Sequence, residues 1–248
     1  MSKKDYILFL ADTNLVLSQR LGEWCGHGPV LEQDIAMTNL SLDCIGQATL
    51  LYKYICELEG NQLNENDLAF LRSEREFKNL LLAEQPNKDF GYTVARQFLI
   101  DAFLLPLFQY IEKQNDQGLA EIASKAVKEL QYHYRWSSEW IIRLGDGTSE
   151  SHQRIQTALN DLWEFTGEMF KYSDFENEMV REKLIPPSDE LLTTWNYHIN
   201  SVLNEATLVR PKDGWFQDGG KRGIHTESLG YLLADMQFMQ RSYPGLDW

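Results

Sequence analysis

Apolar residues recur at helical spacing along most of this sequence, and no segment shows the convincing alternation typical of a strand. The first pattern predicts a helix that ends before Gly28 and Pro29. A second pattern runs from Leu31 to Leu58 and is apolar on nearly all faces, which is typical of a buried helix. The sequence therefore predicts an all-α fold of long helices.

Further helices are predicted along the rest of the chain. They are expected at about 67–84, 90–114 and 118–144, then from a cap at Thr148 or Ser149 to 170, from about 186 to 208, and from a cap at Thr226 to 241. A loop rich in proline and glycine spans 211–223. Because no repeat, low-complexity linker or clear boundary occurs, residues 1–248 are predicted to form a single helical domain with a helical C-terminal extension, about 171–248.

Composition excludes several classes of partner. The 248 residues are 43% hydrophobic with a mean hydropathy of −0.40, as in a globular protein, and carry a formal net charge of −14. That charge would repel nucleic acid and anionic lipid. Three cysteines without metal-ligand spacing indicate a reducing compartment. The polar N-terminus and the lack of an apolar run of ~18 residues predict no membrane span. A cytoplasmic protein is expected.

Polar residues inside the apolar helices are the most informative positions. Two columns have a spacing of four residues, which places their members on one helix face: Asn39, Asp43 and Gln47, and Lys125, Glu129 and His133. Asp101 is the only charged residue in the segment 98–108. A carboxylate in such a setting needs a partner.

Carboxylates on facing helices suggest a comparison with di-iron bundles, which use a Glu-x-x-His pair on each of two helices. That pair is absent here, because Gly46 follows Asp43 by three residues and Tyr132 follows Glu129 by three, one position before His133. We therefore expect a degenerate pseudo-site with buried ion pairs, in which Lys125, with Arg96 or Lys128, replaces metal cations. Its members are Asp43, Asp101, Lys125, Glu129 and His133. An independent di-iron oxidase or oxygenase with unusual ligands stays open as the alternative.

The glycine-rich segment 219–223 precedes the last predicted helix, where backbone amides could attract an anion. It lacks Walker spacing and a preceding strand, so an ordinary structured loop is the favoured interpretation. No Gly-x-Ser-x-Gly motif occurs, and no catalytic nucleophile is predicted.

Several strings resemble the C subunits of bacterial 1,2-phenylacetyl-CoA epoxidases, multicomponent monooxygenases of aerobic phenylacetate degradation. The resemblance covers nearly the whole chain and follows the expected order. Its strings are Leu17-Ser18-Gln19-Arg20-Leu21-Gly22-Glu23-Trp24-Cys25-Gly26-His27, Leu42-Asp43 with Gly46-Gln47-Ala48, Glu84-Gln85-Pro86-Asn87, Lys128-Glu129 with Tyr132-His133, and Gly219-Gly220-Lys221 with His225-Thr226-Glu227 and Leu229-Gly230.

The resemblance implies a ferritin-like four-helix bundle with additional helices that has no metal of its own. It implies a non-catalytic subunit that stabilises a catalytic A subunit with a di-iron centre, while a reductase subunit supplies electrons. By position, the residues expected to border the coenzyme A thioester of phenylacetyl-CoA are Glu76, Phe77, Lys78, Asn79, Asn177, Glu178 and Met179. A scaffold that binds only protein is a further possibility, in which Lys78 would have no role in substrate binding.

Overall fold

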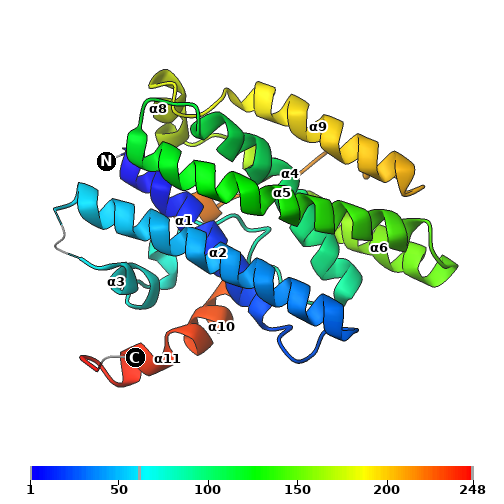
Figure 1. Ribbon diagram of the computed structural model, residues 1–248, viewed down its shortest axis with the longest axis horizontal. Helices are drawn as coiled ribbons and strands as arrows, with labels where there is room; N and C mark the ends of the chain where they lie inside the picture. The colour runs from blue at the N-terminus through cyan, green and yellow to red at the C-terminus, as the bar shows by residue number, and fades with distance from the viewer. Residues whose placement is uncertain (1, 61–62, 247–248) are drawn as a thin grey trace. The chain divides into compact units, whose positions relative to one another are not determined.

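The computed structural model describes residues 2–60 and 63–246, and they form an all-α fold without any strand (Figure 1). The predicted fold class is thus confirmed, and the helices are consistent with a ferritin-like fold. The backbone divides into two compact units, residues 1–86 with 219–248 and residues 87–218. The single domain with an extension from about 171 stays a prediction.

The first unit is built on two long helices that pack along each other, α1 (Ser2–Gly22) and α2 (Leu31–Leu58) (Figure 1). Residues 64–86 and the C-terminal segment complete the unit. They contain short helices: α3 (Glu65–Phe70), η1 (Glu74–Glu76), η3 (Gly220–Arg222), α10 (Glu227–Met236) and α11 (Phe238–Ser242).

The glycine-rich loop 219–223 is fixed by close packing within the first unit. A Cβ atom on Gly220 would lie 2.1 Å from the Asn79 carbonyl oxygen, and one on Gly223 would lie 2.1 Å from the Arg75 carbonyl oxygen. Gly223 also has a positive φ of 74°, which favours glycine. These glycines therefore let the loop lie against the segment 75–79.

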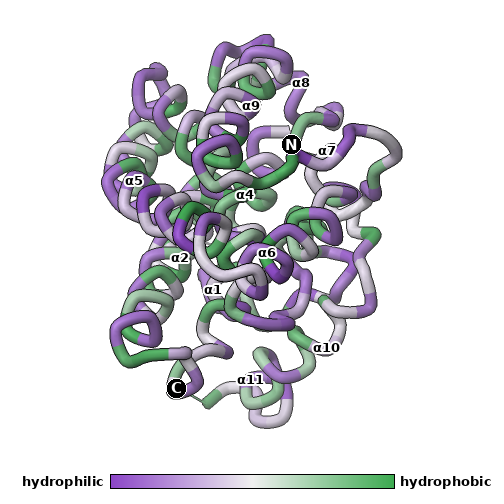
Figure 2. Tube along the Cα trace, turned by 90° about the vertical axis from the view of Figure 1, so that its right-hand side faces the viewer, coloured by the Kyte–Doolittle hydropathy of each residue, from purple (hydrophilic) through white to green (hydrophobic). Residues whose placement is uncertain are grey.

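The second unit is centred on α4 (Phe90–Ile111), which packs along α5 (Gln117–Gly145). The α4 tube is mainly coloured as hydrophobic in Figure 2, and Asp89 caps its first turn by accepting a hydrogen bond from the Tyr92 amide. The other helices are α6 (Ser149–Leu162), η2 (Trp163–Phe165), α7 (Gly167–Phe170), α8 (Asp174–Arg181) and α9 (Ser188–Glu205).

Helix α4 is long and apolar enough to cross a membrane by length and composition, which the sequence analysis did not expect. However, 83% of its most apolar window is buried inside the molecule. A buried helix with this composition is typical of a protein core, so α4 is weak support for a membrane span.

Two predicted helices are wrong in part. The helix expected at 67–84 ends at Phe70, because Phe77 and the leucines that follow it are buried as a non-helical segment. The helix expected to reach 170 is broken by η2 and α7, although its predicted cap is confirmed: Thr148 accepts a hydrogen bond from the Ser151 amide. Thr226 holds the N-cap position of α10, but its hydroxyl caps no amide among the described residues.

The last predicted helix is divided at Gln237, which separates α10 from α11. The buried Gln237 amide donates hydrogen bonds of 3.1 Å to the carbonyls of Ala69 and Arg72. This side chain therefore ties the C-terminal helices to the end of α3.

The prediction that α2, apolar on nearly all faces, is a buried helix is wrong for one face. One face of the helix carries large apolar side chains that are exposed: Leu31, Ile35, Leu42 and Ile45. We call these four residues the α2 stripe.

Candidate functional site

A buried carboxylate on α1 organises the segment expected to border the coenzyme A thioester. Asp12 is fully buried and forms an ion pair with Arg72, whose Nη1 donates to Oδ2 at 3.0 Å. The Tyr52 hydroxyl donates to Asp12 Oδ1 at 2.6 Å, and the Lys78 amide donates to Oδ2 at 2.8 Å. Both oxygens of Asp12 thus accept hydrogen bonds, and one of these bonds fixes the backbone at Lys78.

The charges of this cluster compensate one another. Burial, and then the Asp12 carboxylate, raise the pKa of Tyr52 well above its ordinary value, so Tyr52 is a neutral donor. Burial alone would lower the pKa of Arg72, but Asp12 outweighs burial and the pKa lies above its ordinary value. The carboxylate is therefore neutralised by a guanidinium, which makes it a poor metal ligand.

A second buried carboxylate holds the same segment from the C-terminal side. Glu84 Oε1 accepts a hydrogen bond of 2.7 Å from the Thr226 amide, and Oε2 lies 3.1 Å from His225 Nδ1. Asn79 donates to Glu84 at 3.1 Å, and His225 Nε2 lies 3.0 Å from the Phe77 carbonyl oxygen. Glu84 thus joins residues 77–79 to the start of α10.

The His225 ring faces two acceptors, a carbonyl and a carboxylate, so both ring nitrogens are donors in the charged form. Burial lowers the pKa of His225, but the hydrogen bond and charge of Glu84 outweigh burial and raise the pKa overall. Two acceptors around the ring and the raised pKa both favour the charged form of His225.

Of the four residues predicted at 76–79, two are at the surface. Glu76 is exposed, and its carboxylate accepts hydrogen bonds from the Ser73 hydroxyl and amide, which lower the pKa of Glu76. Lys78 is half-buried, with its Nζ 3.5 Å from Asp5 Oδ1. Phe77 and Asn79 are fully buried, so their role is to position the segment.

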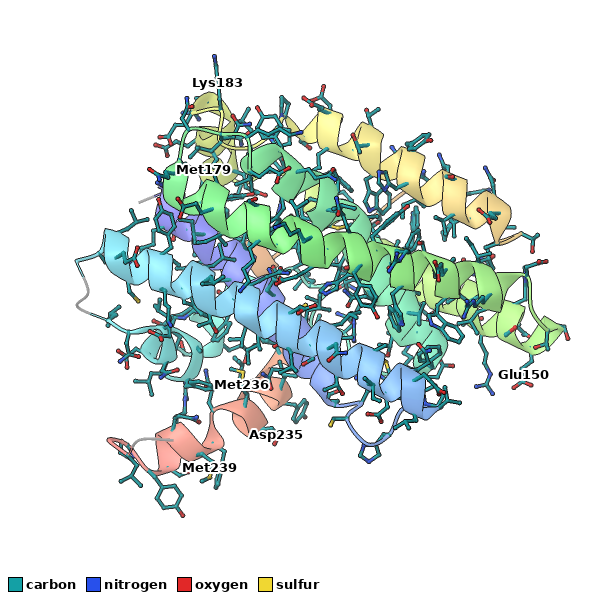
Figure 3. The ribbon with its side chains drawn as sticks, in the orientation of Figure 1. Glu150, Met179, Lys183, Asp235, Met236 and Met239 are labelled. Carbon is teal, nitrogen blue, oxygen red and sulfur yellow. The ribbon has the colours of Figure 1, made fainter. Side chains whose placement is uncertain are left out.

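The other predicted residues lie on α8 in the second unit. Asn177 is exposed and Glu178 is half-buried, whereas Met179 is buried and its carbonyl accepts a hydrogen bond from the Leu184 amide. Figure 3 labels Met179 and also Lys183, whose side chain projects away from the ribbon just after α8. Of the three predicted α8 residues, only Asn177 and Glu178 present polar side chains at the surface.

The pseudo-site residues are only partly brought together. Asp101 is buried in the second unit and accepts hydrogen bonds of 2.7 Å from Gln97 and 2.8 Å from Ser137. Burial raises the pKa of Asp101 to about 6, against the opposing effects of His133 and the two hydrogen bonds. His133 on α5 is close enough to influence this carboxyl electrostatically.

The predicted cations are not buried beside Asp101. Lys125 and Lys128 are exposed on α5, so their expected role as buried counter-ions is wrong. Arg96 is buried, but its guanidinium donates to Asn87 at 2.8 Å. The expected kind of pair, a buried carboxylate with a cation, does occur in this chain, but in the first unit, between Asp12 and Arg72.

The remaining pseudo-site residues are half-buried: Glu129 lies on α5 and Asp43 on α2 in the first unit. Within residues 2–60 and 63–246, no three His, Cys, Asp or Glu side chains gather as a metal ion would require.

Sequence reasoning did not predict four residues of the first unit as site residues: Asp12, Arg72, Glu84 and His225. Glu84 and His225 occur in the strings that carry the family resemblance, but no role was assigned to them. Asp12 carried a usable signal, because it is the only charged residue among the apolar side chains of 6–17, the same criterion that singled out Asp101. Its partner Arg72 lies sixty residues away in sequence and had no comparable signal.

A profile of the family described as phenylacetic acid catabolic protein matches residues 1–248. The chain belongs to this family. It is 47% identical over 243 residues to an Escherichia coli (strain K12) protein named as the C subunit of 1,2-phenylacetyl-CoA epoxidase, and the match covers 98% of each chain. The resemblance predicted from the sequence is thereby confirmed.

Proposed function

We propose that this chain is the non-catalytic C subunit of a 1,2-phenylacetyl-CoA epoxidase in aerobic phenylacetate degradation, where it stabilises a separate A subunit. Full-length similarity to a C subunit supports the proposal. The structural observation that carries it is the α2 stripe. A row of large apolar side chains exposed to water is typical of a surface that another protein covers.

The spacing of the stripe fits a partner helix. Leu31, Ile35, Leu42 and Ile45 are separated by four, seven and three residues, which aligns them along one face of α2. Leu31 is 72% exposed and Leu42 is 61% exposed, so these are large apolar surfaces and not edges of the core. Packing against a helix bundle would remove this area from water.

Gly46 is a second indication on the same helix. It follows Leu42 by four residues and lies in the interior of α2, where glycine is unfavourable by about 1 kcal/mol relative to alanine. A Cβ atom built on Gly46 would meet nothing within 4 Å, so packing among the described residues does not require glycine. Close approach of a partner backbone would require it.

The stripe can be tested by co-purification with the A subunit. We expect the Ile35→Glu, Leu42→Glu double variant to fold but to lose the A subunit, because two charges would be buried at the contact. The control is Tyr197→Glu on α9, where the same charge is placed at an exposed aromatic residue outside the stripe. Full retention of the A subunit by the stripe variant would contradict the proposed interface.

We propose further that Glu76 and Lys78 of the first unit border the coenzyme A thioester, while their buried neighbours Phe77 and Asn79 position them. The same role for Asn177 and Glu178 of the second unit stays a prediction from the resemblance. Lys78 can meet a phosphate as a point charge when its Nζ leaves Asp5. Lys78→Ala should raise the KM for phenylacetyl-CoA in the reconstituted complex. Lys4→Ala, which removes a lysine paired with Glu59, should not. An unchanged KM in Lys78→Ala would favour a scaffold that binds only protein.

The proposal puts the di-iron centre in the A subunit, with electrons from a reductase subunit and the complex in the cytoplasm without nucleic acid or membrane. Iron per polypeptide should be near zero in this chain alone and substantial in the co-purified pair. About two irons in the isolated chain would instead support an independent di-iron oxidase.

A further inference from the structure

An aromatic pocket lies within the second unit and has no part in the proposed interface. Its volume is about 430 Å³, within the range of small-molecule sites. Helices α7 and α9 and the segment 210–216 form its walls. Five aromatic side chains line it: Trp163, Phe170, Trp195, Trp215 and Phe216.

The pocket walls are held in place by specific contacts. Trp195 is buried, donates to the Leu99 carbonyl at 3.1 Å, and has its ring centroid 5.5 Å from that of Trp163. A Cβ atom on Gly167 would lie 2.3 Å from the Phe216 ring, so only glycine lets this ring pack there. The rings therefore form a preformed surface for another flat apolar group.

The mouth of the pocket is polar and carries two cationic side chains. Arg210 and Lys171 line it together with a single carboxylate, Asp213, in a chain whose formal net charge is −14. The Arg210 guanidinium lies 5.2 Å from the Trp163 ring centroid and 3.2 Å from Asp213 Oδ2. Lys171 pairs with Asp218 at 2.5 Å. A ligand anion at the rim of the rings would reach these two cations by competing with Asp213 and Asp218 for them.

Two further lining residues favour a ligand. The Asn196 Oδ1 atom is buried and accepts no hydrogen bond from the residues that the structure describes, which is costly unless a ligand or water completes it. Trp215 is 76% exposed beside the opening, an unusual position for an indole in a protein alone in water.

We propose that this pocket binds a single-ring aromatic carboxylate. The ring would stack among the indoles and phenyl rings, and the carboxylate would meet Arg210 and Lys171. The inference does not rest on the proposed subunit role, because every lining residue belongs to this chain and to one unit.

Calorimetry and tryptophan fluorescence on the full-length chain test the inference with phenylacetate as the probe. We expect saturable binding that Trp215→Ala, Lys171→Gln and Arg210→Gln each weaken, the last by about tenfold or more through loss of a charged hydrogen bond. Trp215 and Lys171 are largely exposed, so those two variants should remain folded. Tyr197→Ala, an exposed α9 change outside the pocket, is the control.

Two related probes separate the parts of the site. Benzylamine keeps the ring and reverses the charge, and it should not bind. Cyclohexylacetate keeps the charge and removes the aromatic ring, and it should bind several-fold more weakly. The inference is overturned if phenylacetate does not saturate the chain, if the three pocket variants leave its affinity unchanged, or if benzylamine binds equally well.

Discussion

Replacing Gly46 by alanine should change the stability of the chain and its assembly in opposite directions. The added methyl group meets nothing within 4 Å, so it creates no clash in the chain alone. Alanine in a helix interior is favoured over glycine by roughly 0.8–1 kcal/mol. The isolated variant should therefore be more stable by about this amount, which corresponds to a rise of about 2–4 °C in Tm for a chain of this size.

In the complex the same methyl group would stand between α2 and the proposed partner helix. Overpacking of a close contact costs about 1–3 kcal/mol, which weakens affinity for the A subunit by roughly 5- to 150-fold. Thermal unfolding of the isolated chain and titration of the A subunit by calorimetry would measure the two effects separately.

The matched control for this experiment is Gly214→Ala, which places the same methyl group into open space in the second unit. It should leave affinity for the A subunit unchanged. If Gly46→Ala stabilised the chain and bound the A subunit with undiminished affinity, close approach of a partner helix at this position would be refuted.

Three further predictions concern the buried charges. The pKa of Asp101, about 6 against 3.8, implies that stability falls by roughly 3 kcal/mol as the pH rises from about 4 to above 6, and denaturant unfolding of Asp101→Asn should lack this fall. Arg72→Ala should lose about 3–5 kcal/mol of unfolding free energy, because Asp12 would remain buried without its cation, and Asp12→Asn in the same chain should restore most of it. Because the pKa of His225 is raised, its stabilising contribution should decline as the pH rises above 6.5, and unfolding of His225→Gln should lack that decline; equal slopes in both chains would contradict the assignment.

Helices were predictable from the sequence where one local pattern decides the structure. The bounds of α2 agree with the prediction because apolar periodicity and the glycine after it are both local signals. The expected helix at 67–84 failed because its leucines are buried by long-range packing of a non-helical segment. An apolar pattern also cannot distinguish a face buried in its own chain from one left exposed, which explains the error on the α2 stripe.

The polar residues show the same limit. A lone charge in an apolar segment identified Asp101 as a buried carboxylate, and His133 of the α5 column influences it electrostatically. Ser137, which donates a hydrogen bond to Asp101, is 36 residues away from it in sequence. Arg72 and its partner Asp12 are 60 residues apart. Partners across such separations depend on tertiary packing, for which one sequence contains no direct signal.

The first unit is discontinuous in sequence, so during synthesis its last part is made only after the whole of the second unit. Residues 87–218 form a continuous unit that is complete before the C-terminal segment has been made. In the first unit, by contrast, Glu84 bonds to Thr226 and His225, and Arg20 donates to the Ser228 carbonyl. These partners are synthesised last. A chain without residues 219–248 would therefore keep every residue of the second unit, but its Glu84 carboxylate would lack the Thr226 amide and the His225 ring as partners.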